Sequence, residues 1–538
     1  MDLINLICLV AFIFLCGLLP YWLYKSIRSA IRFNKQVNIN RYDHKGMMEK
    51  KLQILNFFKE KFPYLLDAAI SPDEQKLFIN QSFDPRTFHD EIKKRIAGLR
   101  GVKLGSQRFH EYRFEVNVPI QQFQKHTYVI GKTGIGKTTL LNNVSKQLIE
   151  SGSGLAIFAY EADMINDVIM MIPQGRENDF IYVNPLDTEK PVTYNPFHIN
   201  EGENIALKNS DVFTVFNRFF DASNMPRTEA ILKNMISTLV RIPGTSMMDI
   251  EPFLDNAGYR NGIINKINDD RLRYFWHNKY LSFPKNSDQP IVNRVDRFIG
   301  DSDSPCRNIF CSSGNSLDFK RVIEENKIVL INLADSLIGE ENAKLIGQML
   351  FAQFQISAMS RAEIEPGKRK PFFLILDEFQ RLLYGSSIET IEQLLSRARK
   401  YGFCLLMANQ QTGQLESQIL DAILGNVGML ISFGLSRKDA DRISKEMNVW
   451  KEGELMRLPS ELIQELQIGE TFTRIGNNSF FMSTPRFDRK WDNEKIDRLE
   501  ELSRDQYGVK PLTDHIRIIS QKEICLNELK LEEMDVYQ

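Results

Sequence analysis

Hydrophobic residues recur with two different periods along this chain. From about Phe114, short runs of β-type residues alternate with stretches in which apolar residues recur every three or four positions. The β-type runs cover 126–130, 154–159 and 179–183, and the helical stretches cover 138–150 and 164–172. Strands that alternate with helices in this way predict a parallel sheet covered by helices, and therefore an α/β fold.

The alternation stops between about Glu201 and Val322, where the period is helical throughout. Apolar residues stand three and four apart over 206–220, 227–240, 248–254 and 269–277. β-type runs resume at 327–333, 371–376, 403–408 and 429–433, each apolar on both faces, as buried parallel strands are. We therefore predict a mostly parallel sheet interrupted by an all-α insertion, with a last strand or hairpin over 470–484.

The beginning of the chain is apolar over 3–24, which is long enough to cross a bilayer core of about 30 Å as a helix. Four basic residues follow within 25–35, whereas the leading end carries only Asp2. The positive-inside rule then places the rest of the chain in the cytosol. A cleaved signal peptide would need a basic leading region and a small-residue cleavage site, and both are missing. We predict a single-pass anchor in the cytoplasmic membrane; the alternatives are a signal peptide and a buried helix.

Composition excludes several classes of protein. With 538 residues, 43% of them hydrophobic, the chain can bury a large core and is neither disordered nor fibrous. Its net charge of -1 excludes a protein that coats nucleic acid through overall positive charge, although a local basic surface such as a ring pore remains possible. Its six cysteines match no metal-ligand spacing, so we expect them to be reduced.

The strongest chemical signal is the segment 131–138, which fits G-x-x-x-x-G-K-[ST] without a mismatch between a predicted strand and a predicted helix. In such a loop, backbone N–H groups and the helix N-terminus bind phosphates. We expect Lys137 to reach the β- and γ-phosphates of ATP and Thr138 to bind Mg²⁺. The strand-to-helix context argues against a coincidental glycine-rich turn. The predicted nucleotide-binding residues are Gly131, Lys132, Thr133, Gly134, Ile135, Gly136, Lys137, Thr138 and Thr139.

A second motif places two acids at the end of the strand predicted over 371–376. We expect Asp377 to hold Mg²⁺ and Glu378 to act as general base on the attacking water. The alternative is a pair of acids that caps a helix. The sequence between the two motifs is much longer than in a small P-loop domain, and the helical insertion accounts for the excess. The pattern therefore predicts one ATP-hydrolysing domain interrupted by one insert.

Polar residues further along complete the predicted chemistry. Gln410 follows the strand 403–408, where its amide could sense the γ-phosphate, although a plain strand cap is the alternative. Arg397, Arg399 and Lys400 form a basic cluster that could reach a neighbouring subunit, although such clusters are usually solvated helix faces.

These motifs follow one another in an order that resembles the type IV coupling proteins of conjugation (TraD/TraG-like), within the HerA/FtsK class of ring ATPases. The resemblance covers roughly residues 110–490. It is carried by Leu-Asp-Glu-Phe-Gln at 376–380, Ser-Arg-Ala-Arg-Lys-Tyr-Gly at 396–402, Ala-Asn-Gln-Gln at 408–411, Gly-Asn-Val-Gly at 425–428, Asn-Pro-Phe at 195–197, Pro-Arg-Thr-Glu at 226–229, Asn-Leu at 332–333 and Gly-Glu at 339–340.

The resemblance implies a RecA-like motor domain with an all-alpha insert, a membrane-anchored N-terminus and a homo-hexameric ring. It also implies single-stranded DNA joined to a relaxase as cargo, secretion-channel proteins as partners, and Arg399 as the arginine that acts on the neighbouring subunit. Two departures stand out. Many relatives have two membrane helices where only one is found here, and their Asp-Pro-x-Gly-Asp segment is replaced by Tyr160-Glu161-Ala162-Asp163.

We accordingly divide the chain into six segments. They are an anchor with a basic juxtamembrane segment (1–35), a linker and small N-terminal domain (36–110), the first part of the RecA-like ATPase domain (111–200), the all-alpha insertion (201–325), the second part of the ATPase domain (326–490) and a charged, mostly helical tail (491–538).

The sequence is compatible with four functions. The leading hypothesis is a membrane-anchored ATPase that pumps single-stranded DNA through a ring. The others are a HerA-type DNA translocase, which the predicted anchor disfavours, a secretion-apparatus ATPase that does not bind DNA, and a P-loop scaffold without turnover, which the intact Lys137, Asp377 and Glu378 disfavour.

Overall fold

The computed structural model describes residues 46–80, 84–220, 225–299, 304–383, 388–451 and 454–510. They fall into two compact units. Unit 1 holds the described residues up to Leu99 together with Val449–Met456, and unit 2 holds Arg100–Asn448 and the residues from Arg457 onward. The predicted membrane span 3–24 lies outside the described residues. Within the described ranges, no helix has the length and apolar character needed to cross a membrane.

Unit 1 is helical apart from a hairpin. Residues 46–61 are helical, and three short helices follow: α3 (Pro63–Ala69), α4 (Pro72–Ile79) and α5 (Pro85–Ala97). Each of the three begins with proline, whose fixed φ suits the first helical position. Phe58, Phe62 and Phe88 are fully buried in the core of this unit. The strands β10 (Asn448–Lys451) and β11 (Glu454–Arg457) form the hairpin, and Lys59 lies over the ring of Trp450 at 4.6 Å.

Unit 2 is built on an 11-stranded sheet with the order β2-β1-β13-β12-β9-β3-β8-β7-β4-β6-β5. The strands from β9 to β5 in that order pair in parallel, whereas β12, β13, β1 and β2 extend the sheet with antiparallel pairs. This confirms the mostly parallel sheet, the seven predicted strands and the final hairpin. Their bounds are β1 Val102–Phe109, β2 Tyr112–Val118, β3 Thr127–Ile130, β4 Gly154–Ala159, β5 Phe180–Val183, β6 Ile328–Asn332, β7 Phe372–Leu376, β8 Phe403–Asn409, β9 Met429–Ser432, β12 Glu470–Ile475 and β13 Asn478–Ser483.

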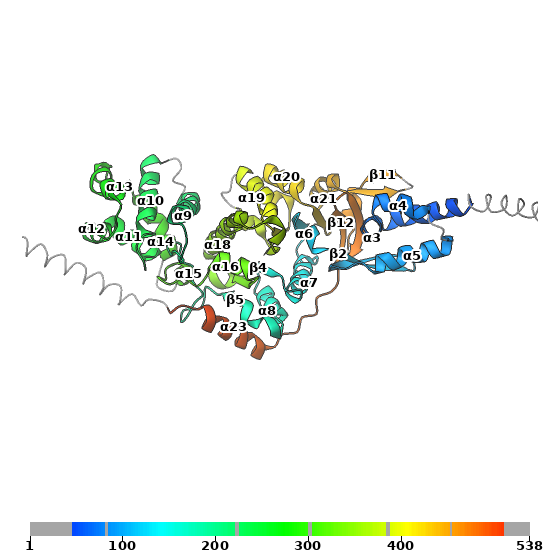
Figure 1. The fold of residues 1–538 in the computed structure, drawn as a ribbon, viewed down its shortest axis with the longest axis horizontal. Coiled ribbons are helices and arrows are strands. Elements are labelled where there is room, and N and C mark those ends of the chain that lie inside the picture. Colours follow the sequence, from blue (N-terminus) through cyan, green and yellow to red (C-terminus); the bar gives the residue numbers. More distant parts are fainter. Residues whose placement is uncertain are drawn as a thin grey trace, which may run out of the picture. The chain divides into compact units, whose positions relative to one another are not determined.

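Helices cover both faces of the parallel part of this sheet (Figure 1). One face carries α7 and α8, and the other carries the long helix α18 with α19 and α20 (Figure 1). Because the strands are enclosed in this way, every residue of β3, β4, β6, β7 and β8 is buried. The helices of this layer are α6 Ile120–Phe123, α7 Lys137–Glu150, α8 Ala162–Met171, α16 Phe319–Glu324, α17 Asp335–Ile338, α18 Glu340–Ser360, α19 Ile388–Lys400, α20 Ser417–Asn426, α21 Arg437–Ile443 and α22 Ser460–Gln464.

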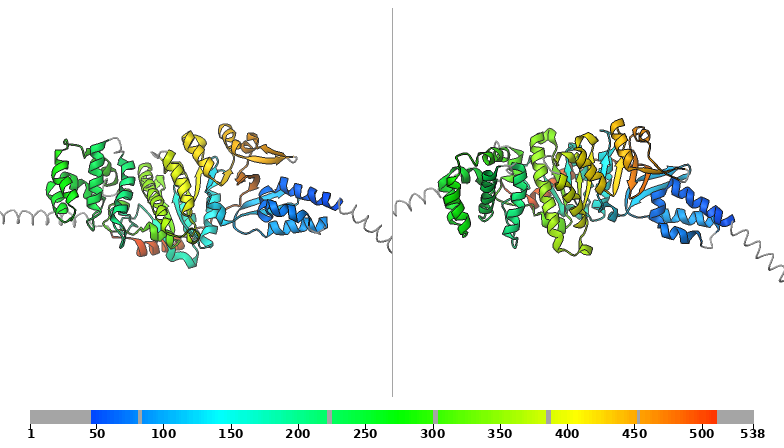
Figure 2. Two further views of the ribbon diagram at one scale, coloured as in Figure 1. Left: turned by 45° about the horizontal axis from the view of Figure 1, so that its top comes forward. Right: turned by 90° about the horizontal axis from the view of Figure 1, so that it is seen from above.

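The region between β5 and β6 is helical, as its period predicts. Its helices lie together as one group (Figure 2). Within this region Trp276 is buried, and its indole N–H donates to Thr238 Oγ1 at 2.9 Å. At the base of the group, Asn195 of the Asn-Pro-Phe segment donates to the carbonyls of Thr245 (2.7 Å) and Ser313 (3.3 Å). The helices are α9 Ile205–Phe220, α10 Pro226–Leu239, α11 Ile250–Asp255, α12 Ala257–Asn265, α13 Asp270–Tyr274, α14 Gln289–Ile299 and α15 Pro305–Phe310.

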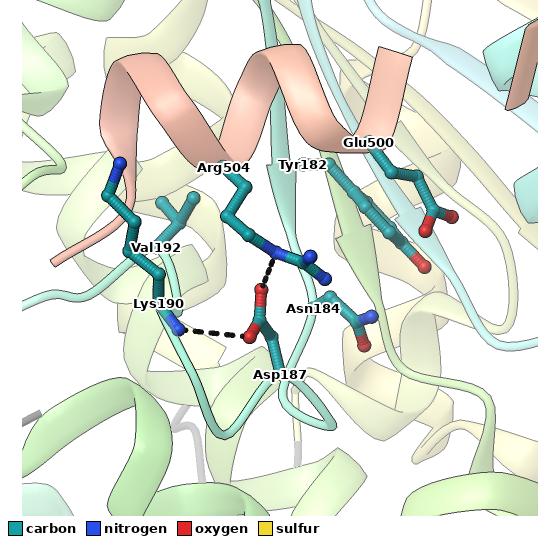
Figure 3. A pocket seen from close by; sticks show the side chains of 7 residues that line it. All are labelled: Tyr182, Asn184, Asp187, Lys190, Val192, Glu500 and Arg504. Atoms are coloured by element: carbon teal, nitrogen blue, oxygen red, sulfur yellow. Dashed lines mark hydrogen bonds and ion pairs between the residues drawn. The ribbon is translucent and has the colours of Figure 1, made fainter. Parts of the chain in front are cut away.

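A C-terminal helix, α23 (Asn493–Tyr507), covers the edge strand β5. Ser503 Oγ accepts a hydrogen bond from the Tyr182 backbone N–H at 2.8 Å, which satisfies a donor that an open sheet edge would expose. Arg504 donates to Asp187 at 2.7 Å, and Asp187 also accepts from the Lys190 backbone N–H at 3.1 Å (Figure 3). The helical prediction for this part of the tail is therefore correct.

A buried histidine joins β3, β8 and α19 at the end of the strands opposite the phosphate loop. His126, which precedes β3, is fully buried and adopts a positive φ of 60°. Its Nε2–H donates to Leu395 O in α19 at 2.7 Å, and its Nδ1 accepts from the Leu405 N–H in β8 at 3.1 Å. These two partners require the neutral ring, and burial lowers the pKa of His126 to about 4.

This histidine predicts an acid-sensitive fold. Unfolded histidine titrates near 6.5, so between pH 6.5 and 4 the unfolded chain binds a proton that the folded chain excludes, and the free energy of unfolding falls as the pH falls. We expect His126 to account for a loss of about 2 kcal/mol between pH 7 and pH 5. Thermal unfolding at both pH values measures it. His126→Asn lacks the titrating ring, so its midpoint should fall less over the same range; an equal fall in both proteins would contradict this assignment.

Candidate nucleotide-binding site

The predicted phosphate loop connects β3 to α7, which begins at Lys137. Gly134 and Gly136 have φ angles of 73° and 118°, a region that L side chains rarely adopt. At Gly131 the restriction is contact, because a Cβ there would lie 2.6 Å from Phe433 Cβ. The glycines therefore determine the conformation of the loop, which ends at the N-terminus of α7, where backbone N–H groups can bind phosphate.

Two backbone contacts fix this loop against the neighbouring part of the sheet. The Lys132 N–H donates to Gly434 O at 3.2 Å, just after β9, and Ile135 O accepts from the Gly469 N–H at 3.0 Å, just before β12. The loop is thus bonded to the segment that follows β9 and to the segment that leads into β12.

Lys137 folds back over the loop that precedes it. Its side chain is only 6% exposed, and Nζ donates to Lys132 O at 3.1 Å. Burial lowers the pKa of Lys137, while the nearby carboxylates Asp377, Glu378 and Glu161 act in the opposite direction. Lys137 therefore lies close enough to these three carboxylates for their charges to favour its protonated form.

The two motifs that are far apart in the sequence meet through one hydrogen bond. Thr138 Oγ1, at the start of α7, donates to Asp377 Oδ2, at the end of β7, at 3.0 Å. Asp377 is 4% exposed, and burial raises its pKa to about 6, against the opposing effects of the Thr138 hydrogen bond and the Lys137 charge. A hydroxyl and a carboxylate are the protein ligands that Mg²⁺ takes beside nucleotide phosphates, so this pair fits the predicted metal.

Both oxygens of the predicted general base accept hydrogen bonds from amides. Gln410 Nε2 donates to Glu378 Oε1 at 2.5 Å, and Gln380 Nε2 donates to Glu378 Oε2 at 2.5 Å. Thr133 Oγ1 in the phosphate loop donates to Gln410 Oε1 at 2.8 Å. Gln410 therefore bridges the loop and the glutamate, which a plain strand cap would not do.

Arg399 lies away from these groups. It belongs to the last turn of α19, which leads into the start of β8, and its charge contributes to the lowered pKa of His126 before β3. The phosphate loop follows the other end of β3, which spans roughly 13 Å at about 3.3 Å per residue. Within one chain the structure does not bring Arg399 to the loop, whereas Thr139 lies in the first turn of α7.

Sequence reasoning missed Gln380 and the side chain of Thr133. Thr133 was expected only as part of the loop, and its hydroxyl bonds to a residue far along the chain. Gln380 stands two residues after Glu378, a spacing that brings side chains together only in a tight turn. No sequence signal announces the left-handed conformation of Glu378 (φ 51°, ψ 40°) that makes this turn.

Comparisons with known proteins bear on the family and the fold of this chain. Residues 371–448 match the family described as the TraM recognition site of TraD and TraG. The plasmid coupling protein TrwB, in complex with a non-hydrolysable GTP analogue or with ADP and Mg²⁺, is similar in structure with a TM-score of 0.51 and 16% identity, over 70% of this chain and 89% of that chain. VirB4 of Thermoanaerobacter pseudethanolicus matches with a TM-score of 0.45 and 15% identity, over 72% of this chain and 97% of that chain. No curated protein matches in sequence. The predicted resemblance to coupling proteins is confirmed, and the TrwB match shows that the fold is shared.

The close contact at Gly131 predicts a strong effect of one methyl group. In Gly131→Ala the new Cβ would meet Phe433 Cβ at 2.6 Å and Ile135 Cγ2 at 2.9 Å, so the loop must move. Overpacking of this kind typically lowers the free energy of unfolding by about 1–3 kcal/mol, measured by thermal unfolding. Gly175→Ala, whose Cβ meets nothing within 4 Å, is the control. Equal midpoints for the two variants would show that the loop yields freely.

Proposed function

We propose that this chain is an ATP-hydrolysing motor of the coupling-protein type, which drives single-stranded DNA, or DNA joined to a relaxase, towards a secretion channel. The observation that carries the proposal is the hydrogen bond between Thr138 and Asp377, because it joins the phosphate loop to the acidic strand end. Lys137 and Glu378 lie beside that bond, so the groups needed for phosphoryl transfer to water surround one point.

Each residue has a role in this proposal. The loop N–H groups and Lys137 bind the phosphates of ATP, and the Thr138 hydroxyl and Asp377 carboxylate hold Mg²⁺, which would neutralise charge on the phosphates when bound. Glu378 takes the proton of the attacking water. Gln410 bonds to both Thr133 and Glu378, so it is suited to report on the γ-phosphate to the general base.

The position of Arg399 supports a ring in which subunits share sites. An arginine at the opposite end of β3 from its own loop cannot stabilise charge there, but it is exposed and could reach the site of a neighbouring copy. We therefore propose a homo-hexamer in which Arg399 acts on the adjacent subunit.

The family match and the sequence support a proposal for the cargo and the location. TrwB is described as a plasmid coupling protein, and the matched family as a recognition site for TraM. We propose that this chain likewise receives DNA through protein partners, and that residues 3–24 anchor it in the cytoplasmic membrane with its bulk in the cytosol. In the ring pore, lysines and arginines would contact DNA phosphates without regard to sequence.

Turnover of ATP by the full chain in detergent, with and without single-stranded DNA, tests the proposal. We expect DNA to stimulate hydrolysis, and Lys137→Ala to lower kcat at least about 100-fold because it removes phosphate contacts. Lys146→Ala, on the exposed face of the same helix, is the matched control and should turn over like the parent. Turnover that DNA does not change would favour a secretion-apparatus ATPase, and equal turnover by Lys137→Ala and the parent would contradict the site.

Mixing inactive variants tests the shared site. Arg399→Ala and Lys137→Ala should each be inactive, yet a mixture that exchanges subunits should recover about a quarter of parental turnover, because that fraction of interfaces pairs an intact loop with an intact arginine. A mixture of Lys137→Ala and Glu378→Gln should recover nothing, since both changes fall in the same half of the site. Failure of the first mixture after verified exchange would reject Arg399 as the shared group.

A further inference from the structure

The amide of Gln380 makes a hydrogen bond that the chemistry of ATP hydrolysis does not require. Gln380 Nε2 donates to Glu378 Oε2 at 2.5 Å while Gln410 Nε2 donates to Glu378 Oε1 at 2.5 Å. A carboxylate acts as general base by accepting a proton from water at one of its oxygens. In the conformation described, both oxygens of Glu378 already accept from an amide.

The turn after β7 brings Gln380 back to Glu378. Glu378 has φ 51°, a left-handed conformation that is costly for a residue with a side chain. The chain then forms a tight turn over Phe379–Arg381, in which the Arg381 N–H donates to Glu378 O at 3.0 Å. Phe379 is buried and packs edge-to-face on Tyr128, with ring centroids 6.0 Å apart, so the turn is held in place.

The two amides differ in how they connect to the phosphate loop. Gln410 Oε1 accepts a hydrogen bond from Thr133 Oγ1 in the loop, so a phosphate bound in the loop would compete directly for the side chains of Thr133 and Gln410. Gln380 has no such bond, and its Oε1 is buried without a hydrogen-bond partner. Nucleotide binding therefore acts directly on the hydrogen bonds of Gln410, whereas it does not directly break the bond between Gln380 and Glu378.

We propose that Gln380 is a positioning residue that restrains Glu378 and keeps hydrolysis slow until a second event, beyond nucleotide binding, moves the turn at 378–381. The inference rests on the proposed function. In the reaction, water attacks the γ-phosphorus, the bond to the ADP oxygen breaks, and the proton of the water passes to Glu378. The Gln380 hydrogen bond stabilises the ionised carboxylate and fixes its orientation, so release of Gln380 raises the affinity of Glu378 for that proton and lets the carboxylate turn towards the water.

Turnover of Gln380→Met in the full chain, with Mg²⁺ and ATP and without DNA, tests the restraint. Methionine preserves the length of the side chain but donates no hydrogen bond. We expect kcat to rise about tenfold, the ratio that corresponds to one hydrogen bond to a charged group, and KM to change less than about twofold because Gln380 does not contact the loop. Stimulation by DNA should shrink by the same factor. Gln393→Met, on the exposed face of α19, is the control and should match the parent.

Two further variants separate a restraint from a structural role. Gln380→Asn, whose amide is too short to span the gap, should raise kcat like methionine, whereas Gln410→Met should lower it. Thermal midpoints of both Gln380 variants within about 2 °C of the parent would show that the fold is intact. The restraint is overturned if kcat is unchanged or lower in both Gln380 variants, whatever their thermal midpoints, provided that the parent still shows turnover that depends on Lys137. Absence of Lys137-dependent turnover in the parent would instead overturn the proposed function.

Discussion

The geometry of the candidate site depends on the order of four parallel strands. In the sheet, β8 lies between β3 and β7, and β4 lies on the other side of β7. Parallel strands end at the same edge, so the phosphate loop after β3, Gln410 after β8, Asp377 after β7 and Glu161 after β4 meet there although they come from distant parts of the chain. The hydrogen bond between Thr138 and Asp377 is the point at which this convergence becomes a direct contact.

Burial works against charge on both Asp377 and Lys137 at that edge of the sheet. Burial raises the pKa of Asp377 to about 6 and lowers that of Lys137, so both charged forms are disfavoured where they stand. A polyphosphate would add a further anionic partner for Lys137, and a divalent cation would offset the negative charge of Asp377 and of the phosphates. Burial of both groups is thus a cost in the free protein that the proposed ligands together would offset.

Hydrogen bonds fix the elements at both ends of the parallel strands. The loop is bonded through Lys132 and Ile135 to segments beside β9 and β12, so a shift of the loop must displace the start of the antiparallel extension or break those bonds. The elements at the opposite end of the strands are tied by His126, which fixes β3, β8 and α19. These bonds hold α19, the helix that carries Arg399, to β3 and β8.

The sequence alone determined the alternation of strands and helices, the helical period of the insert and the chemistry of the phosphate loop, because each is written in short-range spacing. It also predicted Asp377 and Glu378 from a buried strand that ends in acids. Only the tertiary structure decided that Thr133 bonds Gln410, that Gln380 returns to Glu378, and that Arg399 lies at the far end of β3. Strand order, the Thr133–Gln410 bond and the packing of Phe379 on Tyr128 depend on contacts between segments hundreds of residues apart, which the local hydrophobic period does not encode. The Gln380–Glu378 bond is local, but it depends on the left-handed conformation of Glu378, which the residue types do not predict.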